Sequence, residues 1–153
     1  MTAISGLLTA IDLAKRQRDD AGLAMARVAR RCEQALAQME QLQSYAADTA
    51  ARWSVTSQAS ASPQIVGHYY QFMDRLQQTI ELQQGAIVDV QRQREAARQV
   101  LLEAEVRVAG LGRLLQKRQS ELARVQSQRE QRQLDELAAQ MHRRRVLASE
   151  NRE

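Results

Sequence analysis

Residues 54–64 decide the fold, and they read Ser-Val-Thr-Ser-Gln-Ala-Ser-Ala-Ser-Pro-Gln. Small hydroxyl side chains compete with a helix for backbone hydrogen bonds, so this run favours a turn. Ser62 can cap the free N–H groups of a new helix, and Pro63 is tolerated at a first helical position. The sequence therefore predicts a loop over residues 54–63 that separates two helices.

Before this loop, apolar residues recur at alternating steps of four and three, and twelve of the fourteen positions are apolar. An average spacing of 3.5 residues places them in one stripe, which is typical of a coiled-coil helix. We expect this helix over residues 3–53. The stripe consists of Leu7, Ile11, Ala14, Arg18, Ala21, Met25, Val28, Cys32, Ala35, Met39, Leu42, Ala46, Thr49 and Trp53.

A second stripe follows the loop, and fifteen of its eighteen positions are apolar. It predicts a helix over residues 64–145, followed by a tail over residues 146–153. The stripe consists of Val66, Tyr69, Met73, Leu76, Ile80, Gln83, Ile87, Val90, Arg94, Ala97, Leu101, Ala104, Val108, Leu111, Leu115, Arg118, Leu122 and Val125.

Two apolar stripes joined by a short loop predict an all-α fold, an antiparallel coiled-coil hairpin whose second helix is the longer. We expect a single domain over residues 1–153. Folding about the loop pairs positions whose numbers add up to about 118, such as Leu42 with Leu76 and Trp53 with Ile65. Residues after about 115 then lack a partner in their own chain. Stripes of this kind can also pair between chains, which would give a dimer.

Composition excludes most other classes. Among 153 residues there are 24 alanines, 22 glutamines and 20 arginines, but one proline and five aromatic residues. Strand-rich folds need more turn, β-branched and aromatic residues than this. No apolar run approaches the ~20 residues of a bilayer span, and no secretory signal is visible. A lone cysteine, Cys32, fits a reducing cytoplasm.

Catalytic motifs are missing from the sequence. There is no glycine-rich phosphate loop, and the two histidines, His68 and His142, lie far apart. Cys32 has no cysteine or histidine at a metal-ligand spacing. Enzymes need a concave, shielded site, which two paired helices do not enclose. We therefore expect no enzymatic activity, no metal and no cofactor.

Two features exceed what a bare hairpin needs. All five aromatic residues flank the loop, and the adjacent Tyr69 and Tyr70 cannot both face the stripe. These rings either close the end of the hairpin as a small core or form an exposed adhesive patch with Gln38, Leu42 and Leu76 nearby. The two interpretations are compatible.

The second feature is the unpaired C-terminal part of the second helix. The chain carries a net charge of +4, most of it after residue 116, and Arg143–Arg145 lie near the predicted helix end. An unpaired helix either frays or is received by a partner, such as a groove, a membrane surface or a ring. Nucleic acid is disfavoured as that partner because acidic groups are interspersed with the basic ones.

Particular residues resemble those of the FliJ family, the stalk proteins of the bacterial flagellar type III export apparatus. The resemblance spans most of the chain, and its more specific motifs are Tyr69 with Gln71–Phe72 after the loop and Leu134–Asp135–Glu136 near the end. It also rests on Leu8, Asp12, Leu13, Ala14, Met25, Arg30, Arg31, Cys32, Ala35, Leu42, Tyr45, Leu76 and Gln131.

The resemblance implies a non-catalytic role in flagellum biogenesis and motility. Family members insert the open end of the hairpin into the pore of the hexameric export ATPase, like the stalk of a rotary ATPase, and promote its activity. They also contact the cytoplasmic linker of the export gate protein, hand over substrate chaperones, and work in the cytoplasm at the inner membrane.

The resemblance also suggests two binding surfaces in this chain. The gate-binding surface corresponds to Gln38, Leu42, Tyr45, Phe72 and Leu76. The ATPase-binding end corresponds to Leu122, Val125, Arg129, Arg132, Leu134, Leu137 and Met141. Two alternatives stay open: the equivalent stalk of a virulence secretion system, and an arginine-rich helix that binds nucleic acid or a membrane surface.

Overall fold

The protein is built from two α-helices. The structure, a computed structural model, describes residues 2–60 and 62–152. Helix α1 (Thr2–Ser60) has 59 residues and helix α2 (Pro63–Glu150) has 88 residues, and the described ranges contain no strand. The predicted all-α fold with a longer second helix is confirmed.

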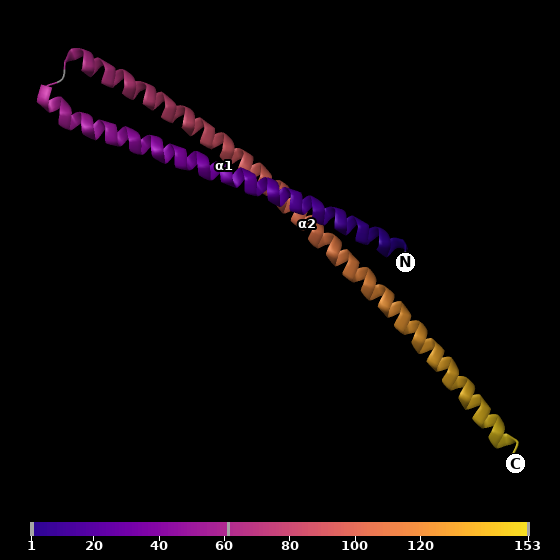
Figure 1. Cartoon of the computed structure of the whole chain (residues 1–153). Helices are drawn as coiled ribbons and strands as arrows, with labels where there is room; N and C mark the ends of the chain where they lie inside the picture. The colour runs from indigo at the N-terminus through magenta and orange to yellow at the C-terminus, as the bar shows by residue number, and fades with distance from the viewer. Residues whose placement is uncertain (1, 61, 153) are drawn as a thin grey trace. The chain divides into compact units, whose positions relative to one another are not determined.

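Contacts along the chain define two compact units. The first, here called the loop unit, comprises Lys15–Val106, and the second, the terminal unit, comprises Met1–Ala14 with Arg107–Glu153. In the loop unit α1 and α2 run antiparallel (Figure 1), and the Gln83 side-chain amide donates a 2.9 Å hydrogen bond to the Ala35 carbonyl. These two positions satisfy the predicted pairing rule, so the hairpin and its register are confirmed at this point.

The apolar stripes form the core of the loop unit. Every stripe position of α1 from Arg18 to Trp53 is buried or half-buried, as is every stripe position of α2 from Val66 to Leu101 except Arg94. Met39, Leu76 and Ile80 form a buried cluster. Burying one such side chain contributes about 1.5–3 kcal/mol, so the stripe supplies most of the hairpin's stability. The half-buried residues packed on this cluster are Leu42, Ala46, Met73 and Ile87.

The connection between the helices is shorter than the sequence predicts. The loop was expected over residues 54–63, but α1 continues to Ser60 and α2 begins at Pro63. Extending an existing helix needs no new nucleus, and a serine or threonine costs at most about 0.7 kcal/mol relative to alanine. The predicted cap is confirmed, because the backbone N–H of Ile65 donates a 3.4 Å hydrogen bond to Ser62 Oγ.

The end of α2 also differs from the sequence prediction. A tail was expected over residues 146–153, but the helix continues to Glu150 and closes with a turn in which Asn151 N–H donates to the Leu147 carbonyl at 3.2 Å. Residues 146–150 contain no glycine or proline that would stop a helix, so the helix propagates.

The terminal unit contains the end of the paired region. Leu7, Ile11 and Ala14 of α1 are buried, whereas every described residue of α2 after Leu115 is exposed. The sequence predicts that residues after about 115 lack a partner in their own chain, and their exposure agrees with this prediction. A hollow lined by Ala3 and Ile4 on one side and by Leu122 and Val125 on the other shows that the start of α1 still flanks this part of α2.

Two residues on the same helix test whether the stripe carries the stability. Ile80 is 7% exposed and Leu82 is 76% exposed. Ile80→Ala should lower the free energy of unfolding by about 2–4 kcal/mol because it leaves a cavity between the helices. Leu82→Ala, the control, should change it by less than about 0.5 kcal/mol. Urea unfolding followed by circular dichroism measures both, and equal effects would contradict this core.

Candidate functional site

The aromatic residues around the loop divide into a half-buried pair and an exposed group. Trp53 stacks on Tyr69, with ring centroids 4.2 Å apart and an interplanar angle of 7°. Tyr69 is half-buried and Tyr70 is exposed, so the two adjacent rings face differently, as predicted. The pairing rule places Trp53 near Ile65; the ring that stacks on Trp53 is Tyr69, one turn further along α2, where the flat indole covers more area than an aliphatic side chain would.

Two of the exposed rings, Tyr45 and Phe72, belong to the first candidate site. This site, here called the loop-end surface, is defined by Gln38, Leu42, Tyr45, Phe72 and Leu76. Tyr45 of α1 meets Phe72 of α2 edge to face, with ring centroids 6.0 Å apart and an interplanar angle of 82°. Tyr45 is 55% exposed and Phe72 is 40% exposed. This ring pair therefore bridges the two helices while about half of its area stays open to solvent, as an interface anchor would.

The other predicted members of this surface differ in their accessibility. Leu42 is half-buried against the Met39–Leu76–Ile80 cluster. Leu76 belongs to that cluster and is 8% exposed, so it supports the surface from below. Gln38 is exposed, and its side-chain oxygen accepts a 3.3 Å hydrogen bond from Gln83. The structure thus brings all five residues together across the paired helices.

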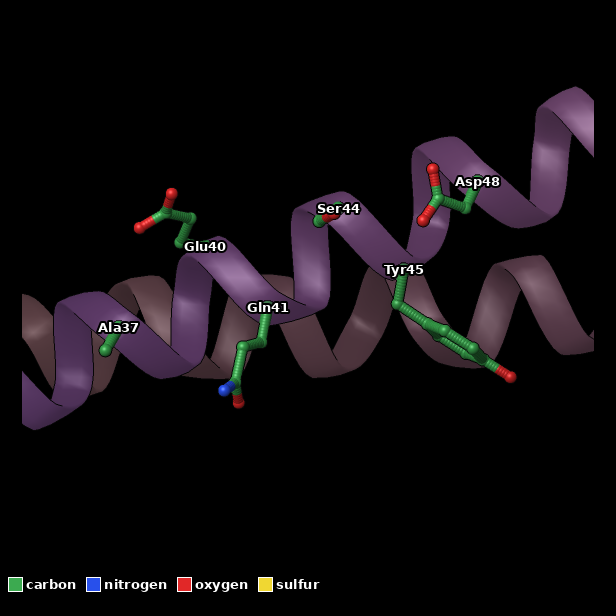
Figure 2. Close-up of a pocket in the computed structure, with 6 residues that line it drawn as sticks. All are labelled: Ala37, Glu40, Gln41, Ser44, Tyr45 and Asp48. Atoms are coloured by element: carbon green, nitrogen blue, oxygen red, sulfur yellow. The ribbon is translucent and has the colours of Figure 1, made fainter.

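Hollows lie on both sides of the Tyr45 ring. One is lined by Gln38, Gln41, Leu42, Tyr45 and Gln83, and it coincides with the predicted surface. The other is lined by Ala37, Glu40, Gln41, Ser44, Tyr45 and Asp48, all from α1 (Figure 2). Glu40 and Asp48 were missed at the sequence level because exposed carboxylates on a coiled coil look like ordinary solubilising residues. The sequence offered one signal for them, which is that both lie within five residues of Tyr45.

The second candidate site, here called the C-terminal arm, is the part of α2 from residue 116 onwards. Its apolar residues Leu134, Leu137 and Met141 are each more than half exposed and recur at helical spacing along one face. Leu122 and Val125 are exposed beside the start of α1, and Arg129 and Arg132 are fully accessible on the same helix. An apolar face of this length without internal packing is suited to burial against another molecule.

Other kinds of site receive no support from the geometry. Among the described residues, no three His, Cys, Asp or Glu side chains gather as they would around a metal ion. Cys32 is buried in the interhelical stripe. Within the same residues, no helix combines the length and apolar character that crossing a membrane requires.

Comparison with known proteins gives a match to a protein family. The model of the family described as "Flagellar FliJ protein" matches residues 5–147, which is nearly the whole chain. No curated protein and no solved structure matches the chain.

Proposed function

Because the chain belongs to the FliJ family of flagellar export stalk proteins, we propose that it couples the hexameric export ATPase to the membrane export gate without catalysing a reaction itself. The observation that carries this proposal is the family match over residues 5–147, and two surfaces with exposed apolar side chains, one in each structural unit, support it. The match favours the flagellar apparatus over a virulence secretion system.

The C-terminal arm supplies the proposed contact with the ATPase. Leu134, Leu137 and Met141 lose their exposed apolar area when the arm enters the pore of the ring, and this burial favours insertion. Arg129 and Arg132 extend the contact as long side chains that pair with carboxylates on the pore wall. Binding to several ATPase subunits at once would stabilise the hexamer, which accounts for promotion of its activity.

The loop-end surface supplies the proposed contact with the export gate. Tyr45 and Phe72 are rigid, partly exposed rings that can anchor the cytoplasmic linker of the gate protein, while Leu42 and Gln38 border the hollow beside them. Handover of substrate chaperones completes the proposed role, and it rests on the family alone. We place the protein in the cytoplasm, at the inner-membrane export apparatus.

Arm contacts can be tested by ATP turnover. Adding the chain to the purified ATPase of the same bacterium should raise both hexamer content and turnover. Leu134→Asp/Leu137→Asp should weaken this stimulation at least about tenfold in half-maximal concentration, because two charged groups replace about 3 kcal/mol of apolar burial. Gln133→Asp/Gln140→Asp adds the same charge to neighbouring exposed positions and should preserve the stimulation. Equal losses in both double variants would contradict the proposed apolar contact.

Gate binding can be tested by removing the exposed rings. Tyr45→Ala and Phe72→Ala should each weaken binding to the gate's cytoplasmic region by about 10–30-fold, the cost of losing an interface anchor of roughly 1.4–2 kcal/mol. Helicity should hardly change because neither ring belongs to the buried Met39–Leu76–Ile80 cluster. Tyr70→Ala is the matched control, since Tyr70 is an exposed aromatic outside the surface. Unchanged gate binding by both ring variants would refute this assignment.

A further inference from the structure

A row of acidic and small side chains runs beside the Tyr45 ring. Glu40, Ser44 and Asp48 occupy successive turns of α1, so they share one face of the helix. Figure 2 shows these three side chains on one side of α1, whereas Gln41 and Tyr45 project from the other. The short Ser44 side chain leaves an open notch between the two carboxylates.

Neither carboxylate takes part in an ion pair among the residues that the structure describes. In the described parts of the chain, no Lys, Arg or His nitrogen lies within the 4.0 Å ion-pair distance of Glu40 or Asp48, and the ion pairs that form, Arg18–Asp19 and Glu95–Arg98, lie elsewhere. In the second of these ion pairs, hydrogen bonds from Arg98 stabilise the charged carboxylate and lower the pKa of Glu95 to about 2.

This local charge is part of a wider asymmetry along the chain. Residues 32–91, which contain the loop-end surface, carry six acidic and two basic groups, whereas the rest of the chain carries twelve acidic and twenty basic groups. A negative region in a chain of net charge +4 favours approach of a positively charged partner and disfavours a phosphate backbone. The loop-end surface is therefore electrostatically distinct from the C-terminal arm.

Three kinds of surface follow one another around α1. The carboxylate row comes first, then the exposed Tyr45 ring, and then the hollow bordered by Leu42, Gln38 and Gln83. A helix laid along α1 would meet acidic groups with one edge and apolar and amide groups with its face. Glu40 and Asp48 are separated by two helical turns, about 12 Å, which a partner helix matches with basic residues two turns apart.

We propose that the loop-end surface binds a basic amphipathic helix of its partner, with an apolar side chain against the Tyr45–Phe72 ring pair and Lys or Arg side chains on Glu40 and Asp48. This inference rests on the proposed function, in which the partner is the export gate, and it specifies the chemical character of the gate segment that binds. The rings supply the affinity, because they are desolvated on binding. The two carboxylates act as specificity residues, because charges at the rim of an interface mainly change the association rate and its salt dependence.

The test uses the full-length chain and the purified cytoplasmic region of the gate protein from the same bacterium, with association and dissociation measured by biolayer interferometry. Glu40→Gln/Asp48→Asn should lower the association rate constant about tenfold at low salt, and Glu40→Lys/Asp48→Lys should lower it further. At about 0.5 M NaCl the parent and the neutral variant should differ by less than about twofold, because salt screens the charges. Tyr45→Ala should instead raise the dissociation rate.

Asp20→Asn/Glu103→Gln is the matched control, since it removes two exposed carboxylates of the loop unit that lie away from the loop-end surface, and it should bind as the parent does.

If the Tyr45 variant binds weakly but Glu40→Gln/Asp48→Asn binds like the parent, the basic partner segment is refuted and the gate contact stands. If the parent chain does not bind the gate region at all, the gate contact and this inference both fail. If the carboxylate variants change only self-association in analytical ultracentrifugation, the surface binds a second copy of the chain, and the proposal is wrong.

Discussion

The apolar seam between α1 and α2 in the loop unit is the interaction on which the other features depend. Each helix contributes about one buried or half-buried side chain per turn, and Met39, Leu76 and Ile80 form a buried cluster within the seam. A seam this narrow encloses no deep cavity, so the residues beside it remain accessible from both sides. The seam also holds the side chains beside it in place: Tyr45 meets Phe72 across the two helices, and Leu42 packs on the buried cluster.

The same seam explains why the chain offers two chemically different surfaces. In the loop unit both helices are present, so rings from α1 and α2 can meet and form a composite surface bordered by Glu40 and Asp48. In the terminal unit α2 continues beyond its last half-buried residue, Leu115, and its arm displays apolar and arginine side chains of a single helix. The two surfaces also differ in local charge, because residues 32–91 carry an excess of acidic groups and residues 116–153 an excess of basic groups.

The long-range organisation was accessible from the sequence because periodicity reports which side chains face inward. The positions from Leu7 to Trp53 follow from the 3.5-residue repeat, and the register at Gln83 follows from folding the two stripes about the loop. Local features were harder to predict. The serine-rich run up to Ser60 stays helical because propagation outweighs weak propensity, and Trp53 stacks on Tyr69 because ring area outweighs ideal register. The aromatic surface at the loop and the unpaired end of the second helix were predicted from the residues, the family resemblance assigned their partners, and these roles stay predictions.

The most direct test of this account is a distance between spin labels on the exposed residues Glu33 and Asp89, which lie on opposite helices of the loop unit, in a chain with Cys32→Ala. Paired helices are 8–10 Å apart between axes, so the labels should lie within about 25 Å of each other. The distance should persist when labelled chains are diluted with unlabelled ones, since the pairing is within one molecule. A separation above about 50 Å within one chain, or a short distance that disappears on dilution, would contradict the intramolecular hairpin.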